Sequence, residues 1–78
     1  MKYVRVIEQN GQESIALFPH SPEKVSHKEA LAWLDFKEQA ARDGGWEVRR
    51  EGDVVFARKD YGHTVKNRKF SIRRASWL

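Results

Sequence analysis

The chain contains no cysteine. This excludes disulfide bonds, thiolate nucleophiles and every zinc site that needs sulfur ligands, and it is consistent with a reducing compartment. Long apolar runs are missing as well. The amino terminus, residues 1–5, alternates charged and apolar residues instead of entering a signal-peptide core, and no stretch approaches the length of a membrane span. We therefore expect a cytoplasmic protein that does not enter a membrane.

Groups that could do chemistry are sparse. His20, His27 and His63 lie far apart in the sequence, in predicted turn or cap regions, and Ser14 lacks the context of a nucleophile elbow. Gly44-Gly45 leads out of a predicted helix into a strand, the reverse of a phosphate-binding loop. The sequence predicts no catalytic residue, no metal ligand and no cofactor, and an enzyme is the least expected class.

What the chain does contain is enough material for one small core. It has 78 residues, of which 40% are hydrophobic and 33% charged. A chain of this size supports one hydrophobic core, and it does not form a deep, substrate-enclosing pocket. We expect a single domain over residues 1–78, with residues 75–78 as a short tail.

The charge is unevenly distributed. The formal net charge is +4, but residues 1–41 carry a balance of −1 and residues 42–78 carry +5. The second half is therefore the electropositive one, and a surplus of this kind favours a polyanionic or acidic partner.

Asn10-Gly11 predicts a two-residue hairpin turn, because a type I′ turn requires positive φ at both central residues. The register places Glu8 opposite Glu13, so we expect that end of the hairpin to point into water. It predicts two sets of pairs, namely Val6–Ile15 and Val4–Leu17 on a face expected to be buried, and Tyr3–Phe18 and Arg5–Ala16 on the other.

After the hairpin, the sequence predicts a turn and then a long helix. Pro19 ends the second strand, and residues 21–23 predict a cap with a short helical turn. The main helix is expected over residues 26–43, beginning with a capping box that its first residue forms with Glu29. Gly44-Gly45 supplies the left-handed geometry that ends it.

The predicted helix has a wide apolar arc. Ala30, Leu34 and Ala41 are expected to cover the sheet, which leaves Trp33 and Phe36 on a secondary stripe. The sequence leaves two alternatives for what packs against this stripe. It is either loops of the same chain, or a partner or second copy of the protein.

Two strand-like runs, residues 46–50 and 54–59, flank a predicted hairpin turn. A three-residue loop pairs Val48 with Phe56, whereas a two-residue loop pairs Val48 with Val55. The three-residue loop is the favoured alternative, with Phe56 as a core residue.

Residues 60–63 predict a further turn, and residues 69–74 a last strand with Phe70 and Ile72 pointing inward. Residues 64–68 fit either strand or loop. The predicted fold class is α+β, in the order β-β-α-β-β-β, with an antiparallel sheet of about five strands and one helix packed on one face. The face without the helix is where we expect function.

Basic and aromatic residues interleave through the second half, which suggests nucleic-acid binding. Cationic side chains release counterions from phosphates, exposed aromatic rings stack on unpaired bases, and antiparallel ribbons fit the major groove. An ordinary solvated strand face is the competing interpretation. The residues predicted to contact nucleic acid, whether DNA or RNA, are Arg49, Arg58, Lys59, Lys66, Arg68, Lys69, Arg73 and Arg74.

The second hypothesis is a protein-binding or inhibitory accessory module of the phage or mobile-element type. Its basic surface would contact an acidic protein surface, or Trp33 and Phe36 would form the seam of a homodimer. The sequence leaves open whether the protein is a monomer or a homodimer.

Overall fold

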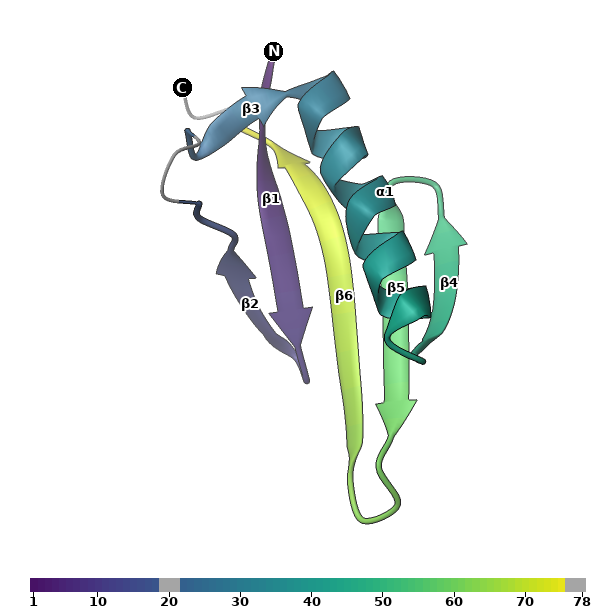
Figure 1. Cartoon of the computed structure of the whole chain (residues 1–78). Helices are drawn as coiled ribbons and strands as arrows, with labels where there is room; N and C mark the ends of the chain where they lie inside the picture. Colours follow the sequence, from purple (N-terminus) through teal and green to yellow (C-terminus); the bar gives the residue numbers. More distant parts are fainter. Residues whose placement is uncertain (19–21, 76–78) are drawn as a thin grey trace.

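The computed structural model describes residues 1–18 and 22–75. In this part of the chain one helix packs on one face of a six-stranded antiparallel sheet, which confirms the predicted α+β class (Figure 1). Pro19, His20 and Ser21 lie outside the described residues. The elements are β1 (Lys2–Gln9), β2 (Gln12–Ile15), β3 (Lys24–Ser26), α1 (His27–Asp43), β4 (Glu47–Glu51), β5 (Val54–Asp60) and β6 (Val65–Arg74).

The strand order is β2-β1-β6-β5-β4, and β3 pairs with the start of β1. The ten-residue strand β6 lies in the middle and pairs with both β1 and β5. Residues 64–68, which fitted either strand or loop, belong mostly to this strand. The first and last described strands are therefore neighbours in the centre of the sheet.

The first hairpin has the predicted turn and register. Val6 pairs with Ile15, and Asn10 and Gly11 have φ values of 49° and 89°, as a type I′ turn requires. The Ala16 N–H continues the ladder by donating to the Arg5 carbonyl at 2.9 Å.

Beyond that point the predicted pairing is wrong. Tyr3 pairs with Val25 and Val4 with Lys24, so β3 takes the edge that we had assigned to Phe18 and Leu17. The chain at Lys24 is strand, not the continuation of a helical turn, because Val25 is buried at 1% exposure against the sheet.

The helix covers the face opposite to the one expected for β1. The main core gathers Trp33, Leu34, Val55 and Phe70, and Ile7 packs against it. Ile7 lies opposite Phe70 on the neighbouring strand, so the odd-numbered residues of β1 face the helix.

The even-numbered residues of β1 face away from the helix. Val4 and Val6 are buried there with Ala75, but Ile15 and Leu17 are exposed at 40% and 68%. The expectation that these four aliphatic residues are buried together is therefore wrong. Ala75 is 5% exposed and donates its N–H to the Lys2 carbonyl at 2.9 Å, so it belongs to the sheet and not to a tail. Residues 76–78 lie outside the described residues.

Both ends of α1 follow the predicted capping chemistry. The Ser26 hydroxyl accepts from the Glu29 N–H at 3.2 Å, which satisfies one of the free amides of the first turn. At the other end Gly45 has φ +82°, and the Trp46 and Gly45 N–H groups donate to the Ala41 and Arg42 carbonyls. These two hydrogen bonds together form a Schellman motif, in which glycine is favoured at the position with left-handed backbone geometry.

The register of β4 and β5 differs from both predicted alternatives. Val48 pairs with Ala57, because the turn is formed by Gly52 and Asp53 alone, with Gly52 at φ +56°. This register puts Ala57 under the helix and Phe56 on the opposite face, so Phe56 is not a residue of the main core.

Leu34 is 0% exposed, whereas Phe36, two residues further along α1, is 66% exposed. We expect Leu34→Ala to lower the free energy of unfolding by about 2 to 5 kcal/mol, because it leaves a cavity between helix and sheet. Phe36→Ala is the matched control and is expected to change it by no more than about 0.5 kcal/mol. Urea unfolding followed by tryptophan fluorescence measures both, and equal losses in the two variants would contradict this packing.

Candidate nucleic-acid interface

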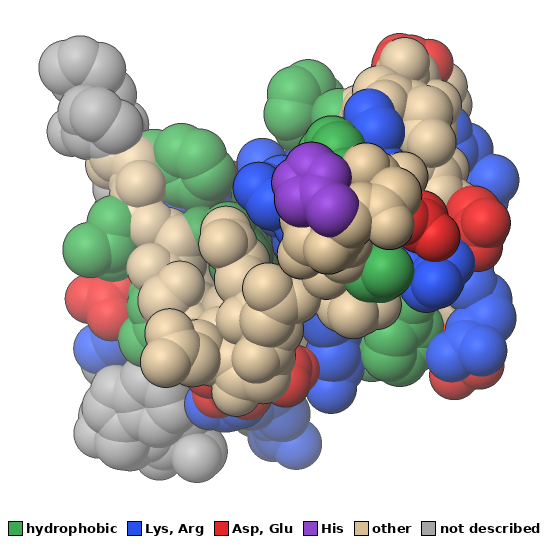
Figure 2. Space-filling model, turned by 90° about the horizontal axis from the view of Figure 1, so that it is seen from below, with side chains coloured by type: hydrophobic (Ala, Val, Ile, Leu, Met, Phe, Trp, Pro, Cys, Tyr) green, Lys and Arg blue, Asp and Glu red, His purple; other side chains and the backbone are tan. Residues whose placement is uncertain are grey.

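The cations that β4, β5 and β6 place on the helix-free face are paired with carboxylates. They lie on β4, β5 and β6, where side chains that alternate with the core residues point away from α1. The ion pairs on this face are Arg49–Glu51 at 3.1 Å, Arg58–Glu47 at 3.7 Å, Lys69–Glu8 at 3.9 Å and Arg73–Glu13 at 2.8 Å. Seen from below, the molecule also shows Lys and Arg side chains close to Asp and Glu side chains (Figure 2). The expectation of an uncompensated basic surface on this face is wrong.

Phe56 lies among these pairs. The Arg49 guanidinium is 4.7 Å from the centroid of its ring, and the Lys69 ammonium is 5.9 Å from it. Each of these cations has its own carboxylate partner, so the row Glu8, Lys69, Phe56, Arg49, Glu51 carries no net charge. This row therefore offers little long-range attraction to a polyanion.

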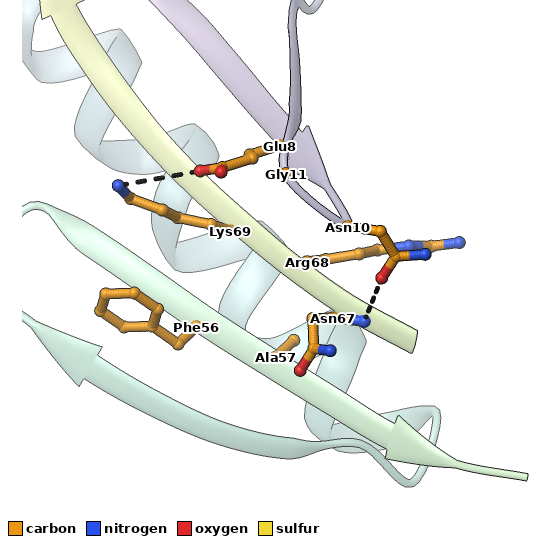
Figure 3. A pocket seen from close by; sticks show the side chains of 8 residues that line it. All are labelled: Glu8, Asn10, Gly11, Phe56, Ala57, Asn67, Arg68 and Lys69. Atoms are coloured by element: carbon orange, nitrogen blue, oxygen red, sulfur yellow. Dashed lines mark hydrogen bonds and ion pairs between the residues drawn. The ribbon is translucent and has the colours of Figure 1, made fainter. Parts of the chain in front are cut away.

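A pocket of about 210 Å³ lies beside Phe56, at the tip of the first hairpin (Figure 3). The Asn67 N–H donates to the Asn10 side-chain oxygen at 3.0 Å, which ties the hairpin tip to β6. The pocket is lined by Glu8, Asn10, Gly11, Phe56, Ala57, Asn67, Arg68 and Lys69. Its charged groups include the Glu8–Lys69 pair, so it lacks the concentrated charge of an anion site.

The helix side carries a different set of cations. Lys59 and Lys66 lie directly opposite each other on β5 and β6, and Arg68 lies opposite Ala57 on the same face. Lys37 projects from α1 and lines, with Arg68, a second pocket of about 130 Å³. We call Lys37, Lys59, Lys66 and Arg68 the ribbon cluster.

No member of the ribbon cluster forms an ion pair with a carboxylate within residues 1–18 and 22–75. Lys59 instead donates to the Gly44 carbonyl at 2.8 Å. Of the eight cations that the sequence predicted as contacts, Lys59, Lys66 and Arg68 lie together here, on the opposite face from the one expected.

Aromatic rings lie under these cations. Lys59 and Lys66 are 5.4 and 5.6 Å from the centroid of the Tyr61 ring, and the Arg68 guanidinium is 4.8 Å from that of Trp46. Cation–π contacts of this length hold the positive groups beside flat rings without neutralising them. Positive charge and aromatic surface are thus combined in one place.

The end of the cluster projects from the body of the protein. The last residue of β1, Gln9, lies opposite Arg68, and the first residue of β4, Glu47, lies opposite Arg58. Residues 59–67 therefore continue as a two-stranded ribbon beyond the other strands (Figure 1). The turn at its tip is held by the Tyr61 N–H, which donates to the Thr64 carbonyl at 2.8 Å.

The remaining predicted site residues lie elsewhere. Arg74 is opposite Tyr3, on the part of β6 furthest from the ribbon. Trp33 is 8% exposed and packs edge-on against Phe70 with a centroid separation of 6.0 Å, so it belongs to the core and Phe36 alone remains exposed. Sequence reasoning missed Lys37, because its place beside Arg68 follows from the way α1 crosses the sheet.

Arg50 is basic but has a structural role. It donates to Asp35 and Glu38 of α1, both at 2.9 Å, and so ties the helix to β4. Hydrogen bonds from Arg42 and then from Arg50 hold the pKa of Glu38 below its ordinary value of 4.5, and the bond to Asp35 raises the pKa of Arg50. These cations are therefore not available to a ligand.

The chain matches no family model, no curated protein and no solved structure among those with which it was compared. Within residues 1–18 and 22–75 no three His, Asp or Glu side chains are grouped as a metal site would need, and no helix there has the length and apolar character to cross a membrane. A function for this chain is therefore inferred from the geometry of the ribbon cluster.

The lowered pKa of Glu38 predicts a pH dependence of stability. A carboxyl whose pKa is lower in the folded state stabilises the fold above its ordinary value of 4.5, and this contribution is lost as the pH falls through the lowered value. We expect Glu38→Gln to be less stable than the wild type at pH about 7, with the difference shrinking toward pH about 3.

Urea unfolding at both pH values measures this effect, with Asp53→Asn in the exposed β4–β5 turn as the control. If Glu38→Gln lowers the free energy of unfolding by the same amount at both pH values, the ion pair between Arg50 and the Glu38 carboxylate does not stabilise the fold.

Proposed function

We propose that this protein is a cytoplasmic, non-catalytic module that binds nucleic acid through the ribbon cluster. The observation that carries the proposal is that Lys37, Lys59, Lys66 and Arg68 are gathered at one end of the helix side with no ion pair to a described carboxylate. Phosphates are the ligands that such a group of cations attracts, because each contact releases a condensed counterion.

The arrangement of the two strands supports the same proposal. Lys59 and Lys66 are directly opposed like charges, which is an unfavourable cross-strand pair in the free protein. An anion placed between them converts this repulsion into attraction. The pair lies on a projecting two-stranded ribbon, an element whose width suits the major groove of about 12 Å in B-form DNA.

Charge-removing variants test the proposal. We expect the triple variant Lys59→Gln, Lys66→Gln, Arg68→Gln to bind nucleic acid much more weakly, because three of four phosphate contacts are lost. The slope of log K against log salt on a duplex should change from about −3.6 to about −0.9. Fluorescence anisotropy of a labelled oligonucleotide over a range of salt concentrations measures the affinity and the slope.

The matched control removes the same charge from the helix-free face, with Arg49→Gln, Arg58→Gln and Arg73→Gln. These cations are already paired with carboxylates, so the control is expected to retain most of the slope. Equal losses in the two triple variants would show that only net charge matters, and wild-type binding that does not depend on salt would exclude phosphate contacts.

A protein-binding accessory role of the phage or mobile-element type is the second candidate, and one observation favours it. Phe36 is 66% exposed on the surface of α1, where an apolar ring is available as a hydrophobic contact for a second copy of the chain. Under this proposal light scattering should show a concentration-dependent dimer that Phe36→Ser abolishes without unfolding the protein. A monomer at every concentration would contradict the dimer.

A further inference from the structure

We infer that the ribbon cluster binds an unpaired strand, with one base stacked on Tyr61 and the flanking phosphates contacted by Lys59 and Lys66. This inference rests on the proposed function and adds to it a contact that unpaired DNA or RNA can make and a duplex cannot. It is carried by one exposed aromatic ring whose centroid lies 5.4 and 5.6 Å from two cations that have no carboxylate partner among the described residues.

Tyr61 has the exposure that a stacking residue needs. It is 44% exposed and lies directly after β5, at the start of the turn that closes the projecting ribbon. Every base has a flat π-face, so a ring in this position can stack on any unpaired base, and the affinity gained is largely independent of sequence. In a duplex the bases are stacked on each other, and the same ring has no base to contact.

The two lysines approach the Tyr61 ring from different strands. The Lys59 ammonium is 5.4 Å and the Lys66 ammonium 5.6 Å from the ring centroid, and the two residues lie opposite each other on β5 and β6. A base in a single strand is flanked by a phosphate on either side along the backbone. The two lysines can therefore contact the two phosphates while the Tyr61 ring contacts the base.

The turn that carries Tyr61 is held in place before any ligand binds. The Tyr61 N–H donates to the Thr64 carbonyl at 2.8 Å, and the Gly62 N–H donates to the Asp60 carboxylate at 2.8 Å. Gly62 adopts φ +90°, a conformation that glycine takes without strain. Because the backbone is already ordered, little conformational entropy is lost when a strand binds.

Two other rings of the described chain that lie near cations lack this combination. Phe56 lies between Arg49 and Lys69, but both of these cations are paired with carboxylates. Phe36 is more exposed than Tyr61, but the one cation recorded beside its ring is Lys37, at 6.0 Å. Tyr61 is therefore the residue to test, and Phe36 is its natural control.

The experiment compares labelled oligonucleotides of one length, namely oligo(dT), oligo(rU) and a DNA duplex, by fluorescence anisotropy at fixed salt. Tyr61→Ala is expected to weaken binding to one or both single strands by about 5- to 150-fold, the range that corresponds to one base stack. Binding to the duplex should stay the same within about twofold, and Tyr61→Phe should keep single-strand affinity because the phenyl ring stacks equally well.

Phe36→Ala is expected to leave all three affinities unchanged, and circular dichroism confirms that each variant is folded.

The inference is overturned if Tyr61→Ala changes the affinity for neither single strand, or weakens binding to single strand and duplex equally. If the Lys59, Lys66 and Arg68 variant still loses duplex binding in that case, the proposed function stands without the stacking residue. If the wild-type protein binds none of the three probes, both proposals fail. The oligo(dT) and oligo(rU) measurements show whether DNA or RNA is preferred.

Discussion

The pairing of β1 with β6 is the constraint on which the rest of the structure depends. It joins the first and last described strands in the middle of the sheet, and every other strand is attached to one of these two or to their neighbour β5. The pairing also decides which face of β1 meets the helix, because Ile7 must lie beside Phe70 in the main core. A shift of one residue would turn every side chain of β1 to the opposite face.

This pairing redistributes the charge of the chain. The acidic surplus of the first half and the basic surplus of the second are separate in sequence, but β1 and β2 bring Glu8 and Glu13 to Lys69 and Arg73. The strands that carry these two carboxylates meet at the turn of the first hairpin and extend no further. Cations of β6 beyond that point, such as Lys66, have no carboxylate from the first half opposite them, and this is why the free positive charge gathers on the ribbon.

Features set by neighbouring residues could be predicted from the sequence, and those set by distant contacts could not. The Asn10-Gly11 turn and the caps of α1 depend on local backbone geometry, and both were predicted correctly. The β4–β5 register depends on Ala57 fitting beneath the helix, and β3 depends on Val25 filling a gap beside β1. For the candidate site, the sequence identified Lys59, Lys66 and Arg68 by composition, but their face follows from a register that only the assembled sheet fixes.

The central position of β6 has a consequence for how the molecule acquires its structure. The first hairpin, the helix and the β4–β5 hairpin are all made before β6 leaves the ribosome, yet β1 and β5 each need β6 as their neighbour. Contacts between residues so far apart in the chain slow the search for the native topology. Val4 and Val6 stay accessible to water, and to other nascent chains, until that last strand arrives, so aggregation competes with folding during this interval.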